Sequence, residues 1–136
     1  MTATVLDTGP LLAAFNSNDK HHERCVEFLT GLRGRKLLPS TVLAEVSRSL
    51  ERWPRVEAAF IEQVVQGTFE LVQLTNDDLR RMSALIIQYA DFPLGAVDAS
   101  VIAVAERFRT DRVATIDRRH FTDVKPHHAG ALHVLP

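Results

Sequence analysis

The sequence has a single cysteine, Cys25, among 136 residues, so no disulfide can form within the chain. A chain of this length can bury a hydrophobic core that stabilises the fold without disulfides or a structural metal. A scarcity of cysteine is typical of proteins from a reducing compartment, and we expect this chain in the cytoplasm. Cys25 has no activating neighbours in the sequence, which indicates a small buried side chain rather than a nucleophile.

Long hydrophobic runs are missing as well. The longest run near the start, residues 9–15, is too short to cross a bilayer and has no basic segment before it. We therefore expect no membrane-spanning segment and no signal peptide. Neither sign of charge dominates, because 16 basic residues face 17 acidic ones. The net charge alone gives no indication of nucleic-acid binding.

Lysine is scarce, and arginine outnumbers it by 13 to 3. The planar guanidinium group suits phosphate oxygens, so an arginine excess fits a protein that contacts phosphates. The codon bias of a GC-rich genome explains the same excess equally well. The arginine content therefore leaves both interpretations open.

Repeats, low-complexity segments and linkers are also absent, which predicts one domain over residues 1–136. Short apolar strands alternate with helical segments along the chain. The predicted strands are 3–7, 36–38, 69–74, 112–116 and 132–135, and the predicted helices are 11–15, 19–33, 40–52, 54–67, 75–90 and 96–107. This alternation predicts an α/β fold, a three-layer α/β/α sandwich with a central, mainly parallel sheet of four or five short strands.

Local signals set the ends of several elements. The segment 8–10, Thr-Gly-Pro, is expected to interrupt the chain after the first strand. Asp19 and Ser40 are expected to cap the helices that follow them, and Thr75 with Asp78 forms a capping box. These signals predict where the connections between strands and helices lie.

Four acidic residues stand out by their apolar neighbours: Asp7, Glu45, Asp98 and Asp117. The first three are each the only charged residue in a stretch of 11 or more positions. The other acids lie among polar residues and indicate solvated helix faces or caps. Burial of a lone carboxylate is costly, so such a group is normally paired, hydrogen-bonded or bound to a metal.

Each of the four acids also has a local interpretation. Asp7 precedes a turn, and Glu45 lies three residues before Arg48. Asp98 lies near a helix start, and Asp117 is followed by two arginines. The fold class favours convergence instead, because sites in parallel sheets form at the carboxyl ends of the strands. Asp7 and Asp117 lie at two such ends.

If the four carboxylates share a pocket, their repulsion has to be neutralised. Two carboxylates about 5 Å apart repel by roughly 3 kcal/mol at an effective dielectric constant of about 20. A set of oxygen donors without cysteine or histidine favours a hard divalent ion, Mg²⁺ or Mn²⁺. Such ions activate water and stabilise phosphate oxygens, which predicts phosphoryl chemistry.

Four motifs resemble the PIN-domain family in their order and spacing. They are residues 5–11 (VLDTGPL), 40–46 (STVLAEV), 94–99 (LGAVDA) and 114–121 (ATIDRRHF). Each motif is weak alone, but the ordered set spans the chain. More narrowly, the chain resembles the VapC-type toxins of bacterial toxin–antitoxin pairs.

This resemblance implies a Mg²⁺- or Mn²⁺-dependent endoribonuclease that acts as a toxin. The implied site consists of Asp7, Glu45, Asp98 and Asp117 as metal-binding and catalytic acids, with Thr8 and Thr115 as hydroxyl groups that orient them or the metal-bound water. The resemblance also implies a homodimer and a cognate VapB-type antitoxin that blocks the acidic site. The RNA substrate is expected to be transfer RNA or ribosomal RNA.

Three residues after the fourth acid are expected to hold flanking RNA phosphates: Arg118, Arg119 and His120. Alternatively, they form a solvated loop that pairs with Asp117 or Asp123. The histidine pairs at 21–22 and 127–128 are expected at the surface. The first pair lies on a predicted helix, where adjacent residues point about 100° apart and make a poor shared metal site. The second pair lies in a loop flanked by proline and glycine.

Three alternatives are weighed: another enzyme class, a receiver domain and a binding module. A phosphatase of the haloacid dehalogenase type also has an aspartate after its first strand, but it needs a second acid where this chain has Gly9. A receiver domain needs a lysine near the sheet edge, and Lys20, Lys36 and Lys125 are badly placed for that. A PIN-like scaffold that binds RNA or a partner without cleavage stays open.

Overall fold

The computed structural model describes residues 2–129 and 132–136. Five short strands form its central sheet: β1 (Ala3–Leu6), β2 (Arg35–Pro39), β3 (Glu70–Val72), β4 (Arg112–Ala114) and β5 (His133–Leu135). They lie in the order β3-β2-β1-β4-β5, and all four pairings are parallel. The predicted parallel α/β sheet is therefore confirmed.

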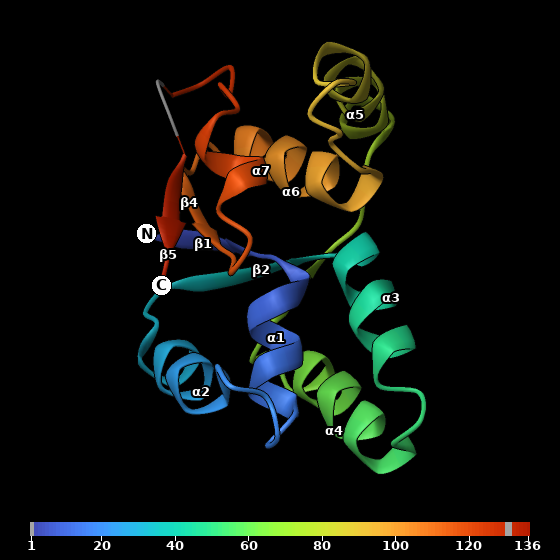
Figure 1. Cartoon of the computed structure of the whole chain (residues 1–136), viewed down its shortest axis with the longest axis vertical. Coiled ribbons are helices and arrows are strands. Elements are labelled where there is room, and N and C mark those ends of the chain that lie inside the picture. Colours follow the sequence, from blue (N-terminus) through green and yellow to red (C-terminus); the bar gives the residue numbers. More distant parts are fainter. Residues whose placement is uncertain (1, 130–131) are drawn as a thin grey trace.

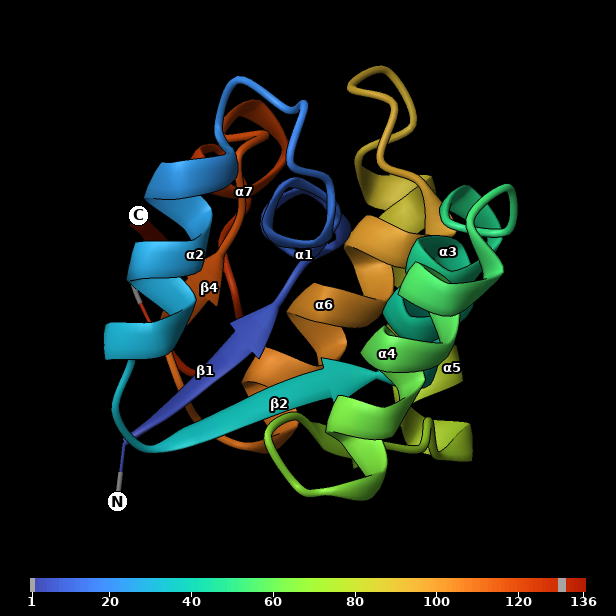
Figure 2. The ribbon, with the colours of Figure 1, turned by 90° about the horizontal axis from the view of Figure 1, so that it is seen from below.

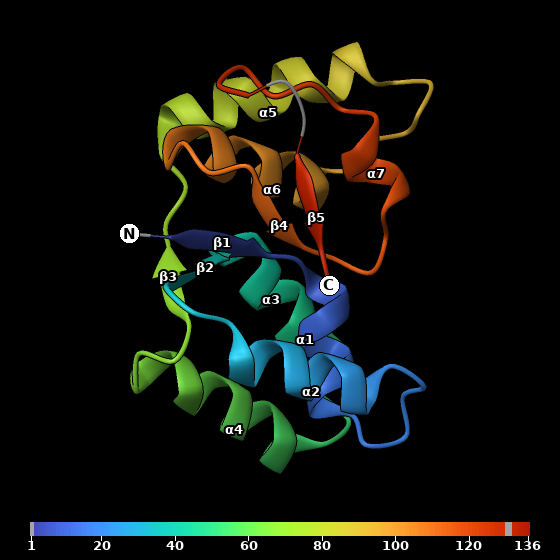
Figure 3. The same cartoon turned by 90° about the vertical axis from the view of Figure 1, so that its left-hand side faces the viewer.

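Helices cover both faces of this sheet. They are α1 (Thr8–Phe15), α2 (His22–Gly31), α3 (Ser40–Ser49), α4 (Pro54–Val65), α5 (Asn76–Gln88), α6 (Ala96–Arg107) and α7 (Arg119–Thr122). Figures 1 and 3 show α5, α6 and α7 on one side of the sheet and α1, α2, α3 and α4 on the other. The predicted three-layer α/β/α arrangement is confirmed.

Helix α6 is enclosed by the rest of the fold. Every side chain from Ala99 to Ala105 is buried, because β1, β2 and β4 lie on one side of the helix and α5 packs against another. A helix enclosed in this way needs an apolar sequence all round. The polar groups of α6 are therefore concentrated near its two ends, where Asp98 and Glu106 lie.

The carboxyl ends of β1 and β4 form the switch point of the sheet. From β1 the strand order continues to β2 on one side, and from β4 it continues to β5 on the other. The register pairs Leu6 with Ala114, the last residues of β1 and β4. Ligands of open α/β sheets bind beyond the carboxyl ends at such a point. Figure 2 shows β1 running into α1 at this edge.

One predicted helix start and one predicted helix cap are wrong. Helix α1 begins at Thr8 rather than at residue 11, because Pro10 falls in the first turn, where its missing N–H is not needed. Ser40 is the first residue of α3 rather than its cap, and Pro39 occupies the N-cap position. Both helices therefore follow their strands without a separate turn.

The predicted cap of α2 is also wrong, whereas that of α5 is confirmed. The Asp19 Oδ1 atom accepts a hydrogen bond from the backbone N–H of His21 at 2.7 Å, and α2 begins only at His22. Thr75 and Asp78 form the predicted capping box at the start of α5. Asp19 thus belongs to the loop between α1 and α2.

Some elements are shorter than predicted, and one was not predicted at all. Strand β3 spans 70–72 rather than 69–74, and β4 ends at residue 114 rather than 116. Helices α2 and α3 end at residues 31 and 49 rather than 33 and 52. The short helix α7 lies where a loop is expected. In the described residues, no helix is long and apolar enough to cross a membrane.

Candidate active site

Asp7 lies directly after β1 and is held there by the sheet. Its backbone N–H donates to the carbonyl oxygen of Ala114 at 2.9 Å, which extends the β1–β4 pairing by one residue. The residue is only 7% exposed. Burial is the main cause that raises the pKa of Asp7 to about 6, and the nearby charges of Asp98 and Glu45 act in the same direction.

Thr115 connects the first and the fourth acid. Its hydroxyl donates to Asp7 Oδ2 at 2.7 Å and accepts a hydrogen bond from the backbone N–H of Asp117 at 3.1 Å. Thr115 follows β4 directly and is 1% exposed. This buried hydroxyl favours the ionised form of Asp7, so it opposes the effect of burial on the pKa.

Asp98 reaches the same place from the first turn of α6. Its side chain is 21% exposed. Burial raises the pKa of Asp98 above its ordinary value, and the charges of Asp117 and Glu45 add to this increase. The charge of His120 and a hydrogen bond from the backbone of Gly95 oppose it. Asp98 and Asp7 are thus both carboxylates that their surroundings make harder to ionise.

Glu45 approaches from α3, and a pair of hydroxyl groups fixes α3 against α6. Ser100 donates its only hydroxyl hydrogen to the carbonyl oxygen of Val97 at 2.6 Å. Thr41 must therefore be the donor in the 2.5 Å contact between the Thr41 and Ser100 hydroxyl oxygens. Thr41 lies one turn before Glu45, and Ser100 lies two residues after Asp98. This contact therefore joins the helix segments that carry the two acids.

His120 lies between two of the acids. Its Nδ1 atom is 2.7 Å from Asp117 Oδ2 and 3.5 Å from Asp98 Oδ2. The imidazole packs edge to face against Phe92 from the α5–α6 loop, with ring centroids 5.5 Å apart. The short helix α7, which the sequence does not predict, is what brings His120 to this position.

The two arginines before His120 lie elsewhere. Arg118 donates from NH2 to the carbonyl oxygen of Pro136 at 2.5 Å. Arg119 is exposed in α7, and neither residue lines the acidic cavity. Their contacts with RNA phosphates remain a prediction.

The four acids line one cavity of about 500 Å³, so their predicted convergence is confirmed. Their burial is not as the sequence indicates, however, because Glu45 is exposed and the Asp117 side chain is 49% exposed. The apolar neighbours of Glu45 explain the difference. Val42 and Val46 are buried on the inner face of α3, whereas Glu45 lies on another face of the same helix.

Two further cavity residues, Asp19 and His21, come from the α1–α2 loop. The predicted role of Asp19 as a helix cap is wrong. His21, predicted at the surface, is partly exposed and lines the cavity. The loop is held by hydrogen bonds from Asp19 N to Asn16 O and from His22 N to Asp19 O, each 3.0 Å long. Nothing in a polar loop sequence separates side chains that face a site from those that face solvent.

The donors of this acidic cavity suit a hard divalent cation. Thr8 adds a buried hydroxyl that lines the cavity and has no hydrogen-bond partner among the described residues. Within residues 2–129 and 132–136, no three carboxylate, imidazole or thiol side chains are arranged to hold an ion as they stand. Glu45 and Asp117 are the two exposed carboxylates of this oxygen-donor set. The residues present therefore fit a metal ion.

Comparison with known proteins agrees with this geometry. The PIN domain family matches residues 4–125 of the chain. Ribonuclease VapC26 of Mycobacterium tuberculosis (strain ATCC 25618 / H37Rv) is 27% identical over 134 residues, which cover 97% of this chain and 99% of the relative. The resemblance drawn from the four motifs, to PIN domains and among them to VapC proteins, is thereby confirmed.

Solved structures share the fold at lower identity. Mycobacterium tuberculosis VapC20, a "Sarcin-Ricin loop cleaving toxin", has a TM-score of 0.75 at 18% identity, covering 81% of this chain and 86% of its own. A toxin-antitoxin complex from Klebsiella pneumoniae has a TM-score of 0.68 at 19% identity, covering 89% of this chain and 92% of its own. VapBC2 from Rickettsia felis, bound to a DNA fragment from its promoter, has a TM-score of 0.70 at 13% identity, covering 99% of this chain and 100% of its own. With a family match over most of its length, the chain belongs to the PIN-domain family.

Proposed function

We propose that this chain is a divalent-metal-dependent endoribonuclease that acts as the toxin of a toxin–antitoxin pair. The observation that carries the proposal is the meeting of four carboxylates, from four separate segments, in one cavity at the switch point of the sheet. The names of similar proteins support RNA as the substrate, because one relative is called a ribonuclease and one structural neighbour a toxin that cleaves the sarcin–ricin loop.

Asp7 and Asp98 are the proposed principal ligands of Mg²⁺ or Mn²⁺, and Glu45 and Asp117 complete the set. A bound divalent ion lowers the pKa of water and stabilises negative charge on the phosphate during hydrolysis. The chain supplies the ligands and their orientation, and it does not need a nucleophilic side chain for this reaction. Hydrolysis breaks one RNA phosphodiester bond, and the oxygen added to phosphorus comes from water.

Two hydroxyl groups support these ligands in the proposed site. Thr115 donates to Asp7 Oδ2 and so keeps that carboxylate in one orientation. Thr8, whose hydroxyl is buried without a partner among the described residues, provides a further oxygen near the metal ligands. Since the pKa of Asp7 is about 6, the carboxylate is ionised and able to bind a cation above this pH.

We further propose the substrate and partners of the protein and the compartment in which it acts. The substrate is transfer RNA or ribosomal RNA, and Arg118, Arg119 and His120 contact its phosphates, with His120 nearest to the acids. A VapB-type antitoxin inhibits the enzyme by covering the acidic cavity, and the chain forms a homodimer in the cytoplasm. Toxin–antitoxin complexes among the structural neighbours support such a partner. Residues 1–136 are proposed to form one nuclease domain.

Incubation of the purified protein with transfer RNA and ribosomal RNA, with and without Mn²⁺ or Mg²⁺, tests the activity. Cleavage that needs the ion and that disappears in Asp7→Asn and Asp98→Asn is the expected result. Asp111→Asn is the matched control, because Asp111 is an exposed acid directly before β4 and does not line the acidic cavity. Sequencing of the cut ends then identifies the cleaved bond.

Two other outcomes point to the alternative functions. Intact RNA after prolonged incubation with folded, metal-loaded protein would support a PIN-like scaffold that binds RNA or a partner without cutting it. Turnover of a small phosphate monoester, with RNA left intact, would support a phosphatase. Either result contradicts the nuclease proposal.

A further inference from the structure

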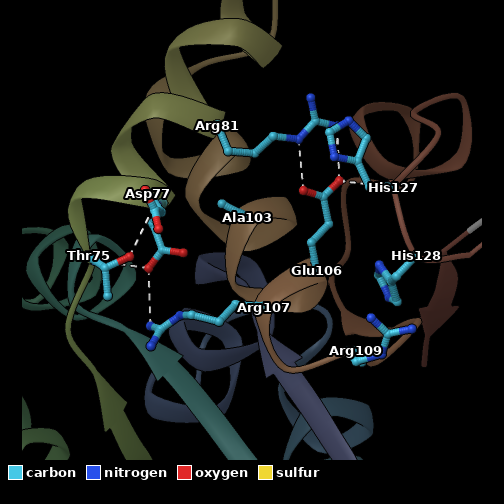
Figure 4. A pocket seen from close by; sticks show the side chains of 10 residues that line it. Thr75, Asp77, Arg81, Ala103, Glu106, Arg107, Arg109, His127 and His128 are labelled. Carbon is cyan, nitrogen blue, oxygen red and sulfur yellow. Dashed lines mark hydrogen bonds and ion pairs between the residues drawn. The ribbon is translucent and has the colours of Figure 1, made fainter.

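A second, larger cavity of about 680 Å³ lies at the opposite end of α6 from Asp98. The beginning of α5, the end of α6, Arg109 and the histidines at 127–128 line it, as Figure 4 shows. Helix α6 has 12 residues and is about 18 Å long. The second cavity is therefore separate from the acidic cavity, and it has no role in the proposed function above.

The acids of this second cavity are already neutralised. Arg81 binds Glu106 through two hydrogen bonds of 2.8 and 3.0 Å, and both side chains are at most 16% exposed. Arg107 NH2 lies 3.1 Å from Asp78 Oδ2, which is almost fully buried. The third lining acid, Asp77, pairs with Arg80 on the surface. No lining carboxylate is left without a cationic partner.

Arg109 is the one charged residue lining the second cavity that is not paired with an opposite charge among the described residues. Among the described residues its guanidinium group has no hydrogen-bond or ion-pair partner. Figure 4 places its side chain beside His128 on one wall of the cavity. The His128 Nε2 atom contacts the carbonyl oxygen of Thr110 at 2.8 Å, while Nδ1 is buried without a partner in the described part of the chain. This wall therefore holds a surplus positive charge.

The backbone of Arg109 is unusual for an arginine. Its φ of 53° is in the left-handed region, and the other described residues with positive φ are Gly34 and Gly67. Arg109 follows α6 in a Schellman-type ending, in which Arg109 N donates to Glu106 O and Thr110 N donates to Ala105 O. Glycine is the usual residue at this position because a β-carbon crowds the backbone there.

An arginine at a position that favours glycine indicates that its side chain takes part in ligand binding, because strained residues concentrate at ligand sites. We propose that this second cavity binds a phosphate oxyanion through Arg109. The phosphate belongs either to the backbone of an RNA whose cleaved bond lies in the acidic cavity or to a small phosphate compound. The RNA source rests on the proposed nuclease function, whereas binding of a small phosphate does not.

The test uses an Asp7→Asn background, in which bound RNA is not cut, and compares Arg109 with Arg109→Gly. Inorganic phosphate is titrated and followed by the NMR signals of His128, which both proteins contain. A fluorescent RNA is then titrated at several salt concentrations. The glycine variant should melt about 3 °C higher, because it relieves the strain. It should bind phosphate about tenfold more weakly, as expected for the loss of a charged hydrogen bond.

Arg109→Lys and Arg55→Gln complete the set. The lysine variant keeps the charge but not the planar fork, and it should retain part of the affinity. Arg55 is exposed at the start of α4, on the other side of the sheet, so its loss should change neither titration. If RNA is the source, Arg109→Gly should lower the slope of log affinity against log salt by about 1.

Each outcome has one meaning. Weaker binding of both ligands supports a site for the RNA backbone, and weaker binding of phosphate alone supports a small phosphate ligand. Equal affinities of Arg109 and Arg109→Gly for both ligands would overturn the inference, even if the protein cleaves RNA. If the protein with Asp7 intact fails to cleave RNA but phosphate binding still depends on Arg109, the nuclease proposal would be overturned and this site would remain.

Discussion

The Thr115 hydroxyl donates to Asp7 Oδ2 at 2.7 Å, although 108 positions separate the two residues in the sequence. Both follow the ends of neighbouring parallel strands, β1 and β4. The pairing of these strands, rather than any local sequence signal, therefore brings the first acid and its hydrogen-bond donor together.

Replacement of the Thr115 hydroxyl should change both the stability of the fold and the pH dependence of the cleavage rate. Thr115→Val keeps the shape but leaves Asp7 Oδ2 without its donor, so it should lower the free energy of unfolding by about 1–2 kcal/mol at pH 7. It should also raise the pKa of Asp7 and move the acidic limb of the cleavage rate to higher pH. Thr115→Ser retains the hydroxyl and is the control. Equal behaviour of the two variants would contradict the assigned hydrogen bond.

Asp7→Asn should stabilise the metal-free protein while it abolishes cleavage. The pKa of Asp7 rises from its usual 3.8 to about 6 on folding, so the folded state binds the proton more tightly than the unfolded state. The contribution of this group to stability is present below pH 4 and is lost as the pH rises toward 6. Its loss corresponds to about 3 kcal/mol, which is the upper limit for the gain from asparagine.

Urea denaturation in EDTA at several pH values measures this effect. The stability difference between Asp7→Asn and the unchanged protein should be largest at pH 7–8 and should vanish near pH 4. Asp111→Asn, which removes an exposed carboxylate, should show no such trend. A difference that stays constant with pH would mean that burial of the charged Asp7 side chain does not destabilise the fold.

Mn²⁺ should stabilise the protein in a pH-dependent way. An ion at about 100 times its dissociation constant adds roughly 2.7 kcal/mol to the free energy of unfolding. The increase in melting temperature should be clear at pH 7.5 and small at pH 5, because protonated Asp7 no longer binds a cation. Asp7→Asn should remove the shift at both pH values. An equal shift at pH 5 and 7.5 would place the ion at other residues.

His21→Ala should weaken substrate binding without affecting the metal. His21 lines the acidic cavity but belongs to the α1–α2 loop rather than to the four acids. Loss of one hydrogen bond to RNA should raise KM about threefold to tenfold and change kcat less. The shift in melting temperature caused by Mn²⁺ should stay the same. Asn18→Ala, an exposed change in the same loop, is the control, and an equal KM in both variants would exclude the role.

Strand ends were predictable from the sequence because a parallel sheet gathers them at one edge. Asp7 and Asp117 could be assigned to that edge from the alternation of strands and helices alone. The exposure of Glu45 could not be predicted in this way, because apolar neighbours on a helix show only that one face of the helix is buried. Val42 and Val46 occupy that buried face, and Glu45 lies outside it.

Residues placed by loops were the least predictable. His21 reaches the cavity through a loop whose shape depends on hydrogen bonds between backbone groups, which any residue can form. The position of His120 was equally hard to predict, because it depends on the four-residue helix α7. Pro10 gave a misleading signal, because proline ends a helix in its interior but is tolerated in the first turn.

Every side chain from Ala99 to Ala105 is enclosed, so the middle of α6 tolerates hardly any change in size. Divergence of this chain toward a new RNA is therefore restricted to surface segments, chiefly the loop at 16–21 and positions 118–120, which leave out the proposed ligand Asp117 and the buried Phe121. Libraries that vary these two segments, and leave α6 untouched, are the ones in which altered cleavage preference should emerge from folded proteins.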